Sequence, residues 1–277
     1  MKEKFIKVLI FTSGFITILL FVVIIAYILI NGIPVISFEF LFANTLDSGR
    51  EGGILPMILS SIYILILTAI FSIPIGVGIA IYMTQYCKNI LLIKFIRFIS
   101  QCLASIPSII YGLFGFTFIV LFLRLGWSIF SASLVLSLMA IPTIFQVSEV
   151  TLNNIPLNLI ESSLGLGATR LQTIISVIIP IAIPGITTGI ILALTRAFSE
   201  AAAVMYVVGS TFQIPLSIFD TGRPLPLHLY ILASEGISFE NAYGTATVLI
   251  FIVLIITIST NYFVNSYQRR IKYEIKS

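Results

Sequence analysis

Long apolar stretches constrain this chain more than any other feature of its sequence. A helix needs about 20 apolar residues to cross the roughly 30 Å of hydrocarbon in a membrane. Six stretches meet that length, at 8–30, 54–82, 95–123, 128–147, 174–208 and 242–264. Only 9% of the 277 residues are charged, whereas soluble domains carry about 25%. The composition excludes a soluble globule, a disordered chain and a disulfide scaffold, and it predicts an all-α integral membrane protein with six transmembrane helices.

The basic residues predict how the chain is oriented, because cytoplasmic connections are enriched in Lys and Arg. With the N-terminus inside, the external segments hold only Arg50, Arg124 and Arg223. The cytoplasmic segments then hold Lys2, Lys4, Lys7, Lys88, Lys94, Arg97, Arg170, Arg269, Arg270, Lys272 and Lys276. Both termini are therefore expected in the cytoplasm, in a multi-pass protein of the cell membrane. The first stretch is too long and bulky for a cleaved signal peptide, so it is expected to remain as a helix.

Two of the connections are too long to be simple turns. The cytoplasmic connection, 148–173, combines amphipathic pieces with Gly165 and Gly167, and it predicts two short helices joined by a glycine bend. The external connection, 209–240, mixes prolines with short amphipathic pieces and predicts a structured cap. Its His228 is the only histidine of the sequence, and we expect a structural role at the surface rather than a metal site.

Several isolated residues have modest predicted roles. Pro107 and Pro142 each remove a helical hydrogen bond and can bend their helices. Glu149, at the end of the fourth stretch, is expected to face water or a neighbouring basic group. Cys87 and Cys102 match neither a metal-site spacing nor a disulfide framework. The sequence therefore predicts no metal-binding residues and no catalytic residues.

The fifth stretch carries two charged residues within its apolar sequence. Arg196 and Glu200 follow Pro180 by sixteen and twenty residues, which is about 24 and 30 Å along an ideal helix. Their spacing places them on one helical face, where they are expected to pair. Intramembrane ionisable residues usually face a cavity or pathway, and a guanidinium matches the oxygens of an oxyanion. We expect a helix-lined path for an anion here, the alternative being a salt bridge that only fixes helix register.

Small residues recur at every fourth position of the same stretch, at Gly185, Gly189, Ala193, Ala197 and Ala201. A stripe of this kind lets another helix approach closely, so the fifth helix is expected at the centre of the bundle. A shorter stripe runs along the second stretch, at Ser72, Gly76, Ala80 and Thr84. The spacing alone leaves open whether the fifth helix packs against a different permease or a second copy of this chain.

The cytoplasmic connection contains a motif that resembles a known family. Permeases of ABC importers carry the signature E-A-A, three residues, Gly, nine residues, then I-x-L-P. This chain has Glu161-Ser162-Ser163, then Gly167, then Val177-Ile178-Ile179-Pro180, with the same spacing throughout. The two serines replace alanines, which leaves the expected short helix unchanged. The resemblance implies the type I (MetI-like) permease fold.

More narrowly, the chain resembles the PstA family of phosphate-importer permeases. The matching stretches include SIPSIIYGLFG and GITTGIILALTRAFSEAAAVM, and the resemblance extends over about 52–265. Ser199 stands where that family usually has glycine, and AAAVM replaces a T-A-P pattern, a departure towards PstC. The resemblance implies a heterodimer with a PstC-like permease, two cytoplasmic ATPase subunits and an external phosphate-binding protein.

The resemblance also implies roles for particular residues. Glu161, Ser162, Ser163 and Gly167 would belong to a coupling helix, about 152–173, that docks into an ATPase subunit. Arg196 would attract the anion, while Glu200 would hold the Arg196 side chain and prevent over-tight binding. The chain lacks the P-loop pattern G-x-x-x-x-G-K-[ST], since no Gly is followed by Lys. ATP is therefore expected on the partner subunits, with no cofactor and no enzymatic activity in this chain.

Three function classes are compatible with a membrane chain of this size. The first is a permease for phosphate or a related oxyanion, and the second is the same architecture for sulfate, molybdate or an amino acid. The third is an intramembrane enzyme or autonomous channel. It is disfavoured because the spans carry no Ser/His dyad or HExxH, and a channel would not need the coupling motif. The expected organisation is a helix and external connector at 1–53, a permease core at 54–268 and a basic tail at 269–277.

Overall fold

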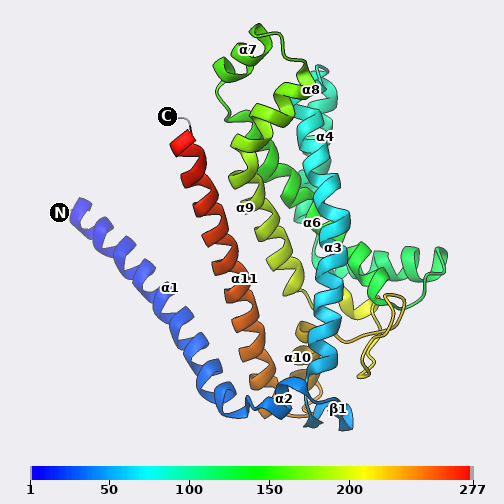
Figure 1. The fold of residues 1–277 in the computed structure, drawn as a ribbon. Helices are drawn as coiled ribbons and strands as arrows, with labels where there is room; N and C mark the ends of the chain where they lie inside the picture. Colours follow the sequence, from blue (N-terminus) through cyan, green and yellow to red (C-terminus); the bar gives the residue numbers. More distant parts are fainter. Residues whose placement is uncertain (1, 275–277) are drawn as a thin grey trace.

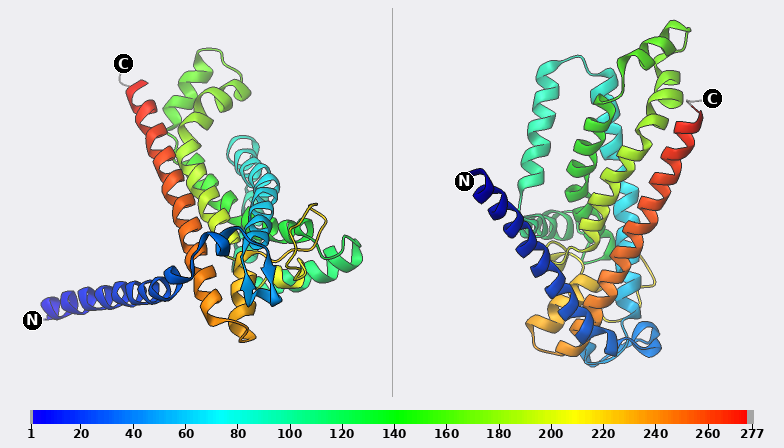
Figure 2. Two further views of the ribbon diagram at one scale, coloured as in Figure 1. Left: turned by 60° about the horizontal axis from the view of Figure 1, so that its bottom comes forward. Right: turned by 90° about the vertical axis from the view of Figure 1, so that its left-hand side faces the viewer.

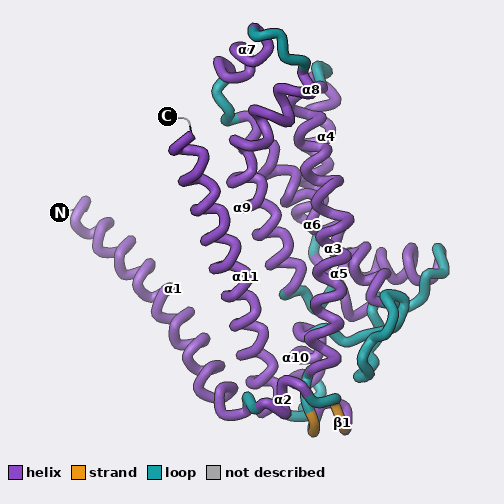
Figure 3. Tube along the Cα trace, viewed as in Figure 1, coloured by secondary structure: helices purple, strands orange, loops and turns teal. Residues whose placement is uncertain are grey.

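The computed structural model describes residues 2–274, which form a bundle of long helices with short helices at both ends (Figures 1 and 3). The long helices are α1 (Lys2–Gly32), α3 (Leu55–Ile81), α4 (Ile90–Ser105), α6 (Ile129–Asn153), α9 (Ile179–Phe198) and α11 (Phe239–Glu274). The shorter α-helices are α2 (Phe38–Phe42), α5 (Ser108–Phe114), α7 (Leu157–Gly165), α8 (Arg170–Thr173) and α10 (Leu225–Ser234). Three π-helical segments extend these helices, namely η3 (Tyr82–Tyr86), η4 (Gly115–Phe122) and η5 (Ile174–Ile178).

The remaining short elements lie close to the ends of the long helices. They are the 3-10 turns η1 (Ile33–Val35), η2 (Asp47–Gly49) and η6 (Val204–Tyr206), and the strands β1 (Thr45–Leu46) and β2 (Glu51–Gly52). The two strands pair antiparallel, with Thr45 opposite Gly52. This small hairpin follows α2 and precedes α3, at the end of the bundle opposite α7 (Figure 1).

Within residues 2–274, five helices are long and apolar enough to cross a membrane, and a bent pair can supply a sixth span. The straight spans are Leu9–Val35, Leu55–Tyr86, Ile129–Asn153, Arg170–Phe198 and Phe239–Tyr262. Five of the predicted stretches are thus confirmed as span-length helices. Helix α11 continues to Glu274, so part of the predicted basic tail is helical, while residues 275–277 of that tail lie outside the described residues.

The third predicted span is not a straight helix. Helix α4 ends at Ser105, and the pair formed by α4 and Ser108–Phe122 is bent by 99° at Ile106 and Pro107. Pro107 precedes the first residue of α5 and cannot donate an amide hydrogen bond to α4. The expectation of a bend at this proline is confirmed, but its size turns the second half of the span sideways. Figure 1 shows α5 and η4 leaving the bundle almost at a right angle.

The fifth span also differs from the prediction, which extended its helix to residue 208. Helix α9 ends at Phe198, and Ser199 caps it with φ −91° and ψ 3°. Figure 1 and the right-hand view of Figure 2 show that α9 stops short of the ends of α3 and α11 that lie beside α10. The chain therefore continues after Ser199 in irregular backbone at the depth of the bundle. Non-helical backbone is tolerated at such depth only where protein covers it or a water-filled path adjoins it.

Small and hydroxyl-bearing residues form the contact between α3 and α6, the most extensive helix–helix contact of the chain. Gly76 lies against α6 so closely that an added Cβ would be 2.8 Å from Ile144. About two helical turns away, the Ser137 hydroxyl donates to the Thr68 carbonyl oxygen at 3.3 Å. Ser72 and Ala80 of the predicted second-span stripe are also buried. The stripe therefore packs the second span onto the fourth.

The cytoplasmic connection folds as predicted, into two short helices with a glycine bend between them. Helix α7 ends at Gly165, and Gly167 has φ +87°, a conformation that L-residues rarely adopt. Thr169 then starts α8 with a capping box, in which its side chain and that of Gln172 each bond the other's backbone. In the right-hand view of Figure 2 the end of α11 lies towards α7, whereas the start of α1 stands away from the bundle at about its middle level.

The external connection is structured, as expected, but two of its residues are not where the sequence placed them. His228 was expected at the surface, yet it lies on α10 with only 1% of its surface exposed. The sequence also predicts a local turn contact between Asp220 and Arg223, but the described part of the chain has no such contact. Instead, the Asp220 carboxylate accepts the amide hydrogens of Leu216 and Ser217.

Candidate functional site

Two segments that each follow a break in a span meet each other and form the frame of the candidate site. One is α5, which follows the break at Pro107, and the other is 199–209, which follows the end of α9. An added Cβ at Gly112 would be 2.8 Å from the carbonyl oxygen of Ala203, so only glycine allows this approach. One turn further on, Gly115 lies against Val207. The stretches SIPSIIYGLFG and RAFSEAAAVM, separate in sequence, are therefore in direct contact.

Arg196 lies beside this junction, in the last turn of α9. Its side chain is exposed, as is that of Leu192 one turn earlier. The guanidinium interacts electrostatically with Tyr111 of α5, whose hydroxyl donates to the Leu103 carbonyl oxygen at 2.8 Å. No ion pair joins Arg196 to an acidic residue anywhere in 2–274. An unpaired guanidinium facing hydrocarbon is strongly unfavourable, so this face of α9 needs polar or aqueous surroundings.

The predicted pairing of Arg196 with Glu200 is wrong. Because α9 ends at Phe198, the two residues do not share one helical face. The Glu200 carboxylate instead accepts the amide hydrogen of Ala202 at 3.1 Å. It also lines a cavity of about 10 Å³, which is about the space of one water molecule. Other lining residues, from α3, α6 and the end of α9, include Ser61, Ile64, Leu65, Thr68, Leu136 and Ala197. Glu200 is thus directed into the chain while Arg196 faces out of it.

The stripe of small residues on α9 packs against α6 of the same chain. An added Cβ at Gly189 would be 2.8 Å from Val147, and one at Gly185 would overlap Thr151. Ala193 is buried in a cluster with Ala140 and Ile144 of α6. Ala197 is buried in a larger cluster that also holds Leu136 of α6. The stripe therefore orients α9, because it turns Arg196 away from α6 and onto the exposed face.

The residues of the cytoplasmic motif lie on and after α7. Glu161, Ser162 and Gly167 are exposed, and Ser163 is half-buried with its hydroxyl 3.0 Å from that of Thr173. Beneath α7 lies a cavity of about 230 Å³ lined by residues of α7, α8, η3, η5 and the end of α6. Arg170 closes one side of it by donating to the Gln85 carbonyl oxygen at 2.9 Å. Helix α7 is thus a short, exposed helix, and only part of the face that it turns towards the spans is in contact with them.

On the external side, a buried arginine connects three segments of the chain. Arg223 is 5% exposed, and its guanidinium donates to the Ser210 hydroxyl at 2.8 and 3.0 Å and to the Ser48 carbonyl oxygen at 3.3 Å. The ring of Phe212 lies 4.4 Å from the guanidinium carbon. Burial lowers the pKa of Arg223, and Glu235 opposes that shift.

His228 lies next to this arginine, with Nδ1 3.5 Å from an Arg223 nitrogen. Since Arg223 is a donor, Nδ1 of the neutral imidazole is the acceptor. Burial, and secondarily the charge of Arg223, lower the pKa of His228 to about 3. His228 is therefore neutral at physiological pH. Residues 2–274 contain no group of three or more His, Cys, Asp or Glu side chains that could hold a metal ion.

Sequence reasoning missed two features of this arrangement. One is the contact between α5 and segment 199–209, because no packing role was predicted for the glycines of SIPSIIYGLFG. The other is an ion pair between α4 and α6, in which Arg97 Nε donates to Glu149 Oε1 at 2.7 Å. Glu149 was expected to face either water or a basic group, and the structure confirms the basic group. Its partner could not be named, because α4 and α6 are far apart in sequence.

Comparison with known proteins identifies the family. Residues 72–273 match the family described as "Binding-protein-dependent transport system inner membrane component". The chain is 34% identical to the probable ABC transporter permease protein YqgI of Bacillus subtilis, over 86% of each chain. It is 31% identical to the phosphate transport system permease protein PstA of Mycobacterium leprae, over 73% of this chain and 67% of PstA.

A solved structure with the same fold is that of a bacterial ABC transporter that imports the acidic polysaccharide alginate. The match has a TM-score of 0.67 and 17% sequence identity over 92% of each chain. At this identity the likeness concerns the fold alone, and it confirms the predicted type I permease architecture. Since the family model covers most of the sequence, the chain belongs to the binding-protein-dependent inner membrane components, the permease subunits of ABC importers.

Proposed function

We propose that this chain is one of two permease subunits of an ATP-driven importer of inorganic phosphate. Arg196 carries the proposal, because it is a charged side chain that the fold holds on an exposed face of a span, beside the junction of α5 and segment 199–209. A guanidinium presents several donors to a tetrahedral oxyanion. The similarity to PstA of M. leprae supports phosphate as that anion. The proposed place of action is the cell membrane.

The path for the anion would run along the exposed face of α9, with a PstC-like permease completing it on the other side. Arg196 would attract phosphate there without a carboxylate neutralising it. In this assignment Glu200 has a different role from the one predicted, since its carboxylate stabilises the turn after α9 through Ala202. The proposed transport core is 54–268, preceded by the helix and connector of 1–53.

Energy would come from two cytoplasmic ATPase subunits that contact the exposed side of α7, with Glu161, Ser162, Ser163 and Gly167 in the coupling segment. The glycine bend and the cavity beneath α7 support this, because both allow α7 to shift relative to the spans. An external phosphate-binding protein would deliver the anion. ATP would bind to the ATPase subunits, and this chain would need no cofactor.

A permease for a different solute is the second candidate, because the same fold occurs in the alginate importer. Proteoliposomes that contain this chain, its partner permease and ATPase subunits, and the binding protein would distinguish the two. We expect ATP-dependent uptake of radiolabelled phosphate that excess sulfate does not inhibit. Uptake of sulfate or of an amino acid in place of phosphate would overturn the phosphate assignment and leave the permease assignment intact.

A further inference from the structure

Helix α4 is attached to the rest of the chain mainly along one narrow line. Its principal neighbour is α6, and Ser100 is the one buried residue among Ile90–Ser105. The apolar side chains of its opposite face, such as Phe95 and Phe98, are exposed. Few contacts therefore determine whether α4 stays against the bundle.

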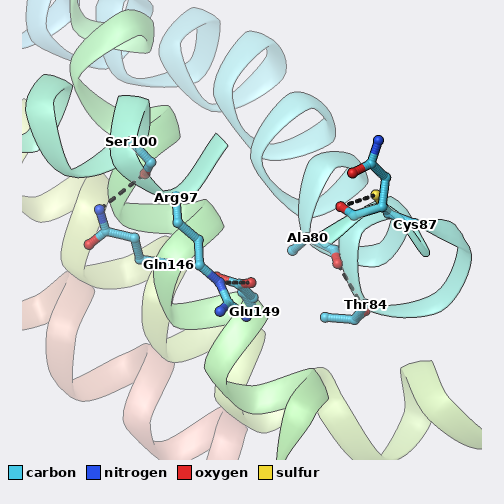
Figure 4. Close-up of polar contacts among 8 residues, drawn as sticks. Ala80, Thr84, Cys87, Arg97, Ser100, Gln146 and Glu149 are labelled. Carbon is cyan, nitrogen blue, oxygen red and sulfur yellow. Dashed lines mark hydrogen bonds and ion pairs between the residues drawn. The ribbon is translucent and has the colours of Figure 1, made fainter. Parts of the chain in front are cut away.

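Two of those contacts are polar and lie one helical turn apart. Arg97 Nε donates to Glu149 Oε1 at 2.7 Å, and Gln146 Nε2 donates to Ser100 Oγ at 3.0 Å. The spacing of three residues on each helix keeps both contacts in one antiparallel register. Figure 4 shows the two contacts side by side between α4 and α6. We refer to these four residues as the α4–α6 clasp.

The two sides of the Arg97–Glu149 contact differ in their access to solvent. The Glu149 side chain is 8% exposed and stays inside the α6 surface, whereas Arg97 is 49% exposed. Arg97 lies seven residues into α4, about 10 Å from its cytoplasmic end. A long guanidinium side chain at that depth can reach the headgroup region on its own. Detachment of α4 would leave Arg97 solvated, so the contact can open.

The position of the clasp connects two parts of the molecule that the proposed function requires to communicate. Glu149 is four residues from the end of α6, and the chain then continues through Pro156 into α7. At its other end, α4 leads through the 99° bend into α5, which contacts segment 199–209 beside Arg196. Helix α4 thus joins the cytoplasmic end of α6 to the wall of the candidate path.

We propose that the α4–α6 clasp is a latch that holds the α4–α5 arm against α6 and opens during the ATP cycle. Arg97 and Glu149 are positioning residues in this view, because they act through α5 and need not touch the transported solute. Movement of α7 would shift the end of α6 that carries Glu149 and release Arg97. The statement that the latch opens during the ATP cycle rests on the proposed function, in which ATPase subunits move α7.

Spin labels can test the latch in the assembled transporter. The sequence has two cysteines, and Cys102 is an exposed residue of α4. The Cys87→Ser, Val150→Cys background therefore gives one label on α4 and one at an exposed position of α6. Double electron–electron resonance then reports the separation of the two helices. The variants to compare in this background are Arg97→Gln, the charge swap Arg97→Glu with Glu149→Arg, and Lys94→Gln.

Lys94→Gln is the matched control, because it removes one positive charge from an exposed α4 residue outside the clasp. We expect Arg97→Gln to raise the population with the longer α4–α6 distance about threefold to tenfold, the range given by single polar contacts between membrane helices. The charge swap should restore the parental distribution, which a variant that merely damaged the fold would not do. ATP with vanadate should raise the longer-distance population in the parent.

Either of two results would overturn the latch: equal distributions for Arg97→Gln and Lys94→Gln, or a parental distribution that ATP with vanadate leaves unchanged. If Arg97→Gln fails to assemble, Gln146→Leu opens the other half of the clasp, and an unchanged distance there contradicts the proposal equally. None of these measurements depends on the transported solute. Failure of the phosphate assignment with intact distance changes would therefore leave the latch standing.

Discussion

Acidification should destabilise this protein through one side chain. His228 is buried beside Arg223, and its pKa of about 3 is far below its ordinary value of 6.5. Between these two values the unfolded chain binds a proton at His228 and the folded chain does not. The stabilising contribution is therefore fully present above pH 6.5 and is lost as the pH falls towards 3.

The size of the effect follows from the same two pKa values. Each pH unit below 6.5 lowers the free energy of unfolding by about 1.4 kcal/mol. From pH 7 to pH 5 the loss is about 2 kcal/mol, since the folded protein hardly takes up the proton at pH 5. For a protein of this size that loss corresponds to a fall in Tm of about 4–8 °C.

The assay is thermal unfolding of the detergent-solubilised protein at pH 7 and pH 5. His228→Gln removes the titrating group and keeps a polar side chain, and no other histidine is present to titrate in this range. We expect a clear fall in Tm for the parent and a much smaller fall for His228→Gln. An equal fall in both proteins would refute the reasoning, because the pH dependence would then come from other groups.

Two further predictions concern glycines and their matched controls. Gly189→Leu should destabilise the protein by about 1–3 kcal/mol, because the leucine side chain would overlap Val147. Gly78→Leu, at an open position of α3, should leave Tm nearly unchanged. Equal Tm values for the two variants would contradict the packing account. Gly167→Ala should strain the bend after α7 by about 1 kcal/mol and reduce ATP-dependent uptake, whereas Gly165→Ala, which meets no neighbour, should not. Uptake that is equal in these last two variants would contradict a role for the bend.

The sequence predicted the straight parts of the fold well, because apolar length and small-residue spacing are local properties. The stripe at Gly185 and Gly189 correctly indicated a tightly packed fifth helix, although its partner is α6 of the same chain. The glycines at Gly165 and Gly167 likewise indicated the two short cytoplasmic helices, whereas the capping box at Thr169 was not predicted.

The errors occurred where tertiary contacts decide the local conformation. After Ser199 and Glu200 the sequence is apolar again as far as Val208, so hydropathy extended the helix and placed Glu200 on the face of Arg196. In the structure the backbone turns after Phe198, because segment 199–209 packs against Gly112 and Gly115 of a distant span. The prediction that His228 lies at the surface was wrong for the same reason, since its burial depends on Arg223 and on Gly49 of the external hairpin region.

The central claim is that Arg196 faces the path of the transported anion and not the lipid. Phosphate uptake by reconstituted transporters carrying Arg196→Ala tests it most directly, with Arg50→Ala as the control, because Arg50 is an exposed external arginine with a solvent-accessible partner. Both variants should assemble. ATP-dependent uptake by Arg196→Ala should fall at least about tenfold, because one charge-assisted contact to the anion is lost. Uptake by Arg50→Ala should remain near that of the parent. Parental uptake by Arg196→Ala would contradict the account.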